Sequence, residues 1–248
     1  MTLVLRSRLL SGLPGLRHGF STRTGGVSKS PYDTLNLAFH QDDSSCVEEN
    51  RKRFARAARL EWPWHEVRQV HGVEVVSEEG AGLHVAADGV MVTRPRLCAV
   101  IKTADCVPLL VARVHSGSVV AVAAIHCGWR GTVDGIVPRA LRNMAGPGTL
   151  YCALGPAISQ RAFEVGPEVV ERARQSLGGR EPNVVIGPRG RPHLDLVALV
   201  KRHIVHAGVD PAHVDDLGLC THSDPRRFFS YRRDGPSGHH AAVIGFEE

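Results

Sequence analysis

The chain lacks several features that assign a protein to a familiar class. Its 248 residues contain no Cys-x-x-Cys pair, and the six cysteines are scattered. This spacing excludes a local zinc finger and indicates free thiols in a reducing compartment rather than a disulfide framework. Arg6 and Arg8 interrupt the apolar N-terminal stretch, which argues against a signal peptide. No apolar run approaches the ~18 residues of a membrane span, so we expect a cytoplasmic protein with no membrane partner.

Aromatic residues and lysine are also scarce. Aromatic side chains make up 5% of the chain and lysine occurs at four positions, although the formal net charge is +5. The densest basic pieces are only the pairs Arg226-Arg227 and Arg232-Arg233. Because nucleic-acid surfaces combine clustered basic residues with aromatic ones, we expect no nucleic-acid partner. No obligate protein partner is evident either.

What is present is enough apolar sequence, 43% of the chain, for a sizeable core. Helical spacing predicts four helices, which follow Ser44-Ser45, Gly131-Thr132, Gly166 and Asp195. Apolar runs predict strands at residues 66–70, 73–76, 97–101, 118–125, 150–154 and 241–244. The mixture of helices and strands without strict alternation favours an α+β fold with mixed sheets. No linker is visible, so residues 1–248 are expected to form a single domain.

Three of the predicted strands end in polar, reactive residues. The strand at 66–70 leads into His71, the strand at 97–101 into Asp105 and Cys106, and the strand at 118–125 into His126. Rigid strands commonly deliver site side chains at their ends. Imidazole and thiolate suit zinc, with copper as a competitor. Three such ligands leave a position for water, whose pKa zinc lowers to about 7.

Spacing alone leaves the alternatives open at this point. Cys106 could be a small buried residue and the two histidines ordinary turn residues. If the three do form a site, Asp105 could orient a histidine or carry a proton.

Further residues could contact a substrate. Arginines near glycines or helix starts suit anions, and an aromatic ring suits a base, while surface turns and ion-pair clusters are the alternatives. The residues in this group are Arg23, Asn36, His40, Arg130, Tyr231 and Arg232.

A series of short motifs covers residues 18 to 245. They include HGFSTRTGGVS, LNLAFH, QVHG, TADC, HCGWRG, LGPAIS, FEVG and CTHSDPRRFFSYRRDG, in that order. On these motifs the chain resembles the YfiH-like family, also called the laccase-domain or polyphenol-oxidase family, the peptidoglycan-editing factors and the purine nucleoside phosphorylases.

The resemblance implies a fold and a set of ligands. It implies a four-layer α-β-β-α sandwich, and it carries the metal ligands over to His71, Cys106 and His126. The sequence departs from the family pattern at Cys127, where a small residue is usual, and at His239, where arginine is expected.

The resemblance also implies an activity. We expect a zinc-dependent purine nucleoside enzyme, with nucleoside and phosphate as partners and with Asp105, Cys106 and His126 as catalytic residues. The expected reactions are phosphorolysis of adenosine, inosine, guanosine and methylthioadenosine, together with adenosine deamination. Some family members serve peptidoglycan precursor editing.

Two other enzyme classes stay open. Cys106 could be the nucleophile of a cysteine hydrolase or amidase, with His71 or His126 as its base. A copper-dependent polyphenol oxidase is the other alternative, although multicopper oxidases need many more histidine ligands than the three that converge here.

Overall fold

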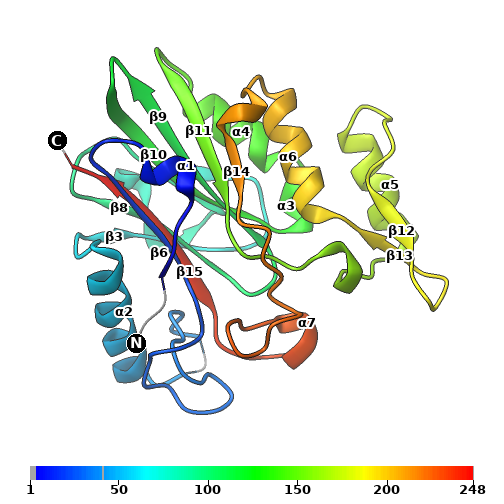
Figure 1. The fold of residues 1–248 in the computed structure, drawn as a ribbon, viewed down its shortest axis with the longest axis horizontal. Coiled ribbons are helices and arrows are strands. Elements are labelled where there is room, and N and C mark those ends of the chain that lie inside the picture. Colours follow the sequence, from blue (N-terminus) through cyan, green and yellow to red (C-terminus); the bar gives the residue numbers. More distant parts are fainter. Residues whose placement is uncertain (1–3, 41, 248) are drawn as a thin grey trace.

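The computed structural model describes residues 4–40 and 42–247. Within them the chain forms two large sheets, packed face to face and flanked by helices (Figure 1). The five-stranded sheet has the order β1 (Val4–Leu5), β2 (Leu16–Ser21), β15 (His240–Phe246), β8 (Cys98–Thr103), β3 (Trp64–His65). The six-stranded sheet has the order β14 (Val214–Asp216), β11 (Thr149–Leu154), β9 (Val107–His115), β10 (Ser118–Cys127), β7 (Gly89–Val92), β5 (Val75–Ser77).

Both sheets are mixed. Pairing is parallel for β3 with β8, for β5 with β7 and for β11 with β14, and antiparallel between the other neighbours. Two small ribbons pair β4 (Val67–Arg68) with β6 (Gly82–Ala86) and β12 (Val184–Ile186) with β13 (Pro192–Leu194). The helices are α1 (Arg8–Ser11), α2 (Ser44–Ala58), α3 (Trp129–Val133), α4 (Ile136–Asn143), α5 (Pro167–Ser176), α6 (Leu196–His206) and α7 (Tyr231–Asp234).

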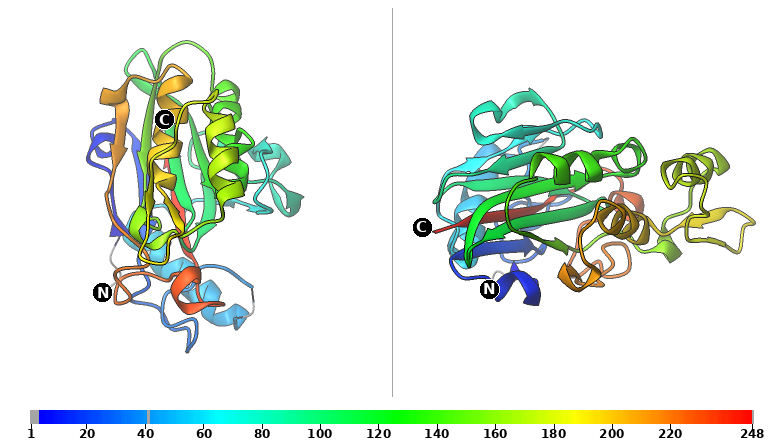
Figure 2. Two further views of the ribbon diagram at one scale, coloured as in Figure 1. Left: turned by 90° about the vertical axis from the view of Figure 1, so that its right-hand side faces the viewer. Right: turned by 90° about the horizontal axis from the view of Figure 1, so that it is seen from above.

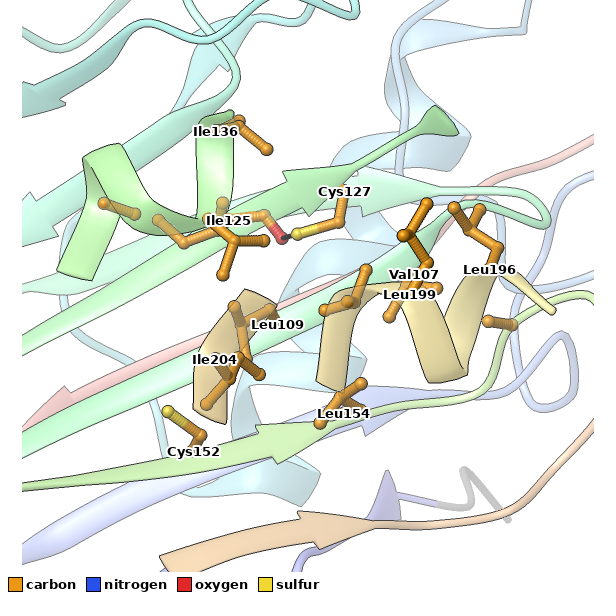
Figure 3. Close-up of a cluster of buried hydrophobic side chains, with 14 of the residues drawn as sticks. Val107, Leu109, Ile125, Cys127, Ile136, Cys152, Leu154, Leu196, Leu199 and Ile204 are labelled. Atoms are coloured by element: carbon orange, nitrogen blue, oxygen red, sulfur yellow. Dashed lines mark hydrogen bonds between the residues drawn. The ribbon is translucent and has the colours of Figure 1, made fainter. Parts of the chain in front are cut away.

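Three buried clusters separate four layers. The first joins α2 to the five-stranded sheet through residues such as Phe54 and Val100. The second lies between the two sheets and includes Ile101 and Leu110. The third joins the six-stranded sheet to α3, α4 and α6 and includes Ile125 (Figure 3). The four-layer sandwich expected from the sequence is therefore confirmed, with α5 and the β12–β13 hairpin projecting to one side (Figure 2).

Strand β10 shows how the sequence selects these layers. Its side chains alternate between the helix-facing core, which holds Ile125 and Cys127, and the core between the sheets, which holds Val122 and Ala124. A strand buried on both faces needs a continuous run of small and β-branched residues. The run from 119 to 125, VVAVAAI, meets that need.

Several predicted boundaries were wrong. The N-cap of α2 is Asp43, whose carboxylate accepts hydrogen bonds from the amides of Ser45 and Cys46. The helix predicted after Gly131-Thr132 is two helices, because Gly135 adopts a left-handed φ of 97° between α3 and α4.

The predicted strand at 66–70 is also shorter in the structure than expected. Within it the structure has β4, Val67–Arg68, which pairs with β6 in a small ribbon, whereas β3 ends before it at His65. Its end leaves the sheet because a buried carboxylate, that of Asp88, binds the amide of Val70. That the whole chain is a single domain remains a prediction. No described helix is long and apolar enough to cross a bilayer.

We expect acid to destabilise this fold partly through His18, which is 2% exposed and accepts a hydrogen bond from the Ser7 amide. Burial and the charge of Arg6 lower its pKa from 6.5 to about 4. The unfolded chain therefore binds this proton more tightly than the folded chain. The contribution of neutral His18 to the unfolding free energy is complete above pH 6.5. It is lost as the pH falls toward 4, at up to about 1.4 kcal/mol per pH unit.

Urea unfolding between pH 6.5 and pH 4 checks this expectation. His18→Gln should reduce the slope of unfolding free energy against pH, whereas His115→Gln, at an exposed strand end, should not. Equal slopes for the wild type and His18→Gln would contradict it.

Candidate metal centre

Three elements bring His71, Cys106 and His126 together. His71 lies in the turn after β4, Cys106 in the turn between β8 and β9, and His126 near the end of β10. One potential ligand atom from each lies within 4.8 Å of the others, and Cys106 Sγ is 3.9 Å from His71 Nε2. His126 is buried, Cys106 is half-buried and His71 is exposed. The group is therefore fixed on its inner side and open to solvent on its outer side.

Asp88 connects two members of this group. Its buried carboxylate accepts hydrogen bonds from the amides of Val70, His71 and Gly72 at 3.1, 2.9 and 2.7 Å. These bonds support the left-handed backbone of His71, whose φ of 60° is uncommon for a residue with a side chain. The same carboxylate lies 2.7 Å from His126 Nδ1, which leaves Nε2 of that ring for a ligand.

Asp105 lines the same cavity as Cys106, but its carboxylate is held by other groups than the sequence suggested. Its carboxylate accepts hydrogen bonds from the Thr221 hydroxyl at 2.6 Å, the Ser230 hydroxyl at 3.0 Å and the Arg232 amide at 2.7 Å. The prediction that Asp105 orients a histidine is therefore wrong for His126, because Asp88 occupies that place. Sequence reasoning missed Asp88, whose one signal is a lone acid in the apolar context AADGVMV.

The neighbouring histidines lower the pKa of the Cys106 thiol, which favours the thiolate form that binds metals. Burial opposes ionisation of Cys106, but the charge of His126 and hydrogen bonds from His126 and His71 lower its pKa to about 6. Burial likewise opposes protonation of His126, but the Cys106 charge and the Asp88 hydrogen bond raise its pKa to about 9. These opposite shifts favour a thiolate at Cys106 and a proton on His126, and metal binding would displace that proton.

The residues present fit a metal ion. Two imidazoles and a thiolate form a borderline-soft donor set that suits zinc or copper. Gly128 leaves the room they need, because a Cβ at this position would lie 2.7 Å from His71 Cδ2 and 3.3 Å from Cys106 Sγ.

We therefore expect Gly128→Ala to displace the side chains of His71 and Cys106 and to lower metal affinity. The expected loss is about 10–100-fold, as when a residue that orients a metal ligand is replaced. Gly128 has an ordinary φ of −69°, so the effect is steric rather than a matter of backbone strain. Gly80→Ala, whose Cβ would meet its nearest neighbour at 3.6 Å, is the matched control. Zinc titration monitored by competition with a chelator measures both, and equal affinities would refute the expectation.

A cavity of about 780 Å³ opens beside the three residues. Its wall includes four of the predicted substrate residues: His40, Arg130, Tyr231 and Arg232. It also includes cations that sequence reasoning did not select: Arg51, Arg68 and Lys102. A larger cavity of about 860 Å³ lies between α4 and α6 and contains none of the predicted site residues.

Two predicted substrate residues lie outside the wall of this cavity. The Arg23 guanidinium donates to the Asp33 and Pro225 carbonyls and pairs with the Asp33 carboxylate at 3.2 Å. Asn36 is 1% exposed, and its side-chain oxygen accepts a hydrogen bond from the His239 amide at 2.9 Å. The structure thus gives both residues roles in holding loops.

A buried ion cluster forms one end of the cavity. Glu66 lies 2.6 Å from Arg51 Nη1 and pairs with Lys102 Nζ at 2.5 Å. The side-chain amide of Gln69 exchanges two hydrogen bonds, both 2.7 Å, with the backbone of Lys102. These contacts tie the turn that carries His71 to strand β8.

The fold and the site define a class of protein: a two-sheet sandwich with one His–Cys–His centre beside a cation-rich cavity. The chain belongs to the family described as multi-copper polyphenol oxidoreductase laccase, whose model matches residues 17–247.

Its relatives cover nearly the whole chain. A purine nucleoside phosphorylase of Deinococcus radiodurans is 39% identical over 247 residues, covering 94% of this chain and 93% of the relative. A purine nucleoside phosphorylase of Pseudomonas aeruginosa is 38% identical over 231 residues and 92% of each chain. The crystal structure of YlmD from Geobacillus stearothermophilus matches with a TM-score of 0.88 and 31% identity, covering 99% of this chain and 96% of that chain.

The family description and the names of these relatives point to different chemistry. Among the described residues, His71, Cys106 and His126 are the one group of at least three such side chains close enough to share an ion. A multicopper oxidase needs several coppers, each with its own ligands.

Proposed function

We propose that this protein is a zinc-dependent purine nucleoside phosphorylase. The observation that carries the proposal is a three-ligand His–Cys–His centre that opens directly on a cavity lined by cations. The cavity volume of about 780 Å³ falls within the ~300–1,000 Å³ usual for small-molecule sites. The cations suit phosphate as one substrate, and the relatives' names indicate a purine nucleoside as the other.

The chain's own residues would bind and orient the two substrates. Arg130, at the start of α3, and Arg232, in α7, supply positive charge for phosphate from the middle and the C-terminal part of the chain. The Asp105 carboxylate fixes the backbone of Arg232, which favours a positioning role over proton transfer. Tyr231, 61% exposed, offers a ring against which a purine can stack.

The reaction would join phosphate to the sugar. A phosphate oxygen attacks C1′ of the ribose while the bond from C1′ to the base nitrogen breaks. The base leaves with the electron pair and takes a proton, giving ribose 1-phosphate. A metal bound by the three ligands supplies Lewis acidity at this place.

Adenosine deamination is the second activity in the proposal. Here water adds at C6 of adenine and ammonia leaves, giving inosine. Its support is that three potential ligands converge among the described residues, which leaves the centre open to water on the exposed side of His71.

A nucleoside panel tests both activities. Adenosine, inosine, guanosine and methylthioadenosine are incubated with and without phosphate, on protein of measured zinc and copper content. We expect base release that requires phosphate. Among the four nucleosides, we expect ammonia release from adenosine only. Metal-loaded protein that releases no base in phosphate would overturn the phosphorylase.

One rival has an observation of its own. The thiolate–imidazolium pair of Cys106 and His126 is also the arrangement of a cysteine hydrolase. A thiol held by a metal resists alkylation, whereas a free nucleophile does not. Rapid iodoacetamide labelling of Cys106 in protein that holds one zinc per chain would favour the hydrolase. Oxidation of a phenol by copper-loaded protein would favour the polyphenol oxidase.

A further inference from the structure

Ser237 stands out in the wall of the cavity. The residue is 7% exposed, and its hydroxyl is a buried side-chain group without a hydrogen-bond partner among the described residues. Ser237 itself forms part of the cavity wall, together with its neighbours Pro236 and His239. A buried hydroxyl without a partner costs stability. Such a group at a cavity wall points to a ligand that supplies the missing partner.

The backbone around Ser237 is held from both sides. The His239 amide donates to the Asn36 side chain at 2.9 Å, and the His239 carbonyl accepts from the Leu37 amide at 3.1 Å. A Cβ on Gly238 would lie 2.5 Å from the Phe229 ring, so this glycine is packed tightly. The segment therefore cannot shift easily to give the hydroxyl a protein partner.

The chemistry of the hydroxyl selects the kind of group that it binds. Phosphate offers mainly acceptor oxygens and negative charge, and the cations Arg130, Arg232 and Lys102 of the same cavity serve it better. A serine hydroxyl both donates and accepts, and so does a sugar hydroxyl.

We propose that Ser237 binds a ribose hydroxyl of the nucleoside and thereby selects ribonucleosides over deoxyribonucleosides. This inference rests on the proposed function and assigns one residue to one part of its substrate.

The test compares wild type, Ser237→Ala and Ser237→Thr with adenosine, 2′-deoxyadenosine and 3′-deoxyadenosine. In the wild type, loss of the hydroxyl that Ser237 binds should lower kcat/KM about 10–100-fold. Ser237→Ala should lower kcat/KM for adenosine by a similar factor and leave that deoxynucleoside unaffected, so that the preference disappears. Ser237→Thr keeps the hydroxyl and should keep the preference.

Two further measurements separate substrate binding from a structural role. Metal content and the KM for phosphate should not change in Ser237→Ala. Its Tm should be equal to that of the wild type or a few degrees higher, because the substitution removes a buried polar group without a partner. A fall in Tm together with lost metal would overturn the inference.

Unchanged substrate preference in Ser237→Ala would also overturn it. If the wild type turns over no nucleoside, the proposed function fails separately, and calorimetric binding of the same three compounds becomes the test. Weaker binding of adenosine to Ser237→Ala alone would then support the inference. Equal binding to both proteins, or none to the wild type, would overturn it.

Discussion

Replacing Cys106 by Ala is expected to abolish metal binding and nucleoside turnover together. The thiolate is the softest of the three ligands and the one that carries a negative charge. Its removal leaves two imidazoles, which are too few for a stable zinc site. Zinc per chain, measured by elemental analysis, should fall from one to near zero. Phosphate-dependent base release should fall at least 1,000-fold, by an order-of-magnitude argument from the loss of several kcal/mol of charge stabilisation.

Cys127→Ala is the matched control. Cys127 neighbours His126 on β10, but its side chain lies in the core facing α3, α4 and α6, where its Sγ is 4.0 Å from the Ile125 carbonyl (Figure 3). Its replacement should cost about 1 kcal/mol of stability and leave metal content and turnover unchanged. Loss of metal in Cys127→Ala would show that the wrong thiol was assigned. A Cys106→Ala protein with full metal and no activity would favour the nucleophile.

Asp88→Asn should have the second largest effect. Both oxygens of the carboxylate accept hydrogen bonds, Oδ1 from the His71 amide and His126, and Oδ2 from the amides of Val70 and Gly72. The asparagine side chain has one oxygen and one NH2 group. Its NH2 group must face the donors on one side, so the hydrogen bonds on that side are lost. We expect a loss of about 3 kcal/mol in unfolding free energy and a 10–100-fold loss in zinc affinity.

Urea unfolding and zinc competition measure these two effects separately. Asp134→Asn, which removes one partner of the exposed ion pair with Arg172, should change stability by less than about 1 kcal/mol and leave zinc affinity unchanged. If Asp88→Asn keeps wild-type zinc affinity, Asp88 does not orient the ligands.

The three candidate ligands could be selected from the motifs QVHG, TADC and HCGWRG. Strands precede Cys106 and His126 as expected, whereas the strand predicted before His71 is reduced to two residues. The alternation of β10 even predicts that Cys127 points away from His126, and the helix-side core that holds Cys127 agrees. Asp88 could not be predicted in the same way. Its partners at 70 to 72 and at 126 lie in separate turns and strands, so only the three-dimensional pairing of β5, β7 and β10 shows why an acid is needed there.

The fold was predictable in its layers and less so in its elements. Strand β9 was missed although it is central, because its Pro108 and the arginine at 113 interrupt the apolar pattern. Arg23 and Asn36 were selected for chemistry because their side chains suit a substrate. In the folded chain, those side chains are instead hydrogen-bonded to loops distant in sequence.

The turn between β8 and β9 carries the chain from one sheet to the other, and Cys106 lies in it. His126 belongs to the second sheet, while Gln69 ties the His71 turn to β8 in the first. An ion shared by these residues would therefore act as a cross-link between the two halves of the sandwich. Sliding of one sheet over the other would then change metal affinity. Substitutions of buried residues between the two sheets, far from the cavity, would therefore change how tightly the protein retains zinc.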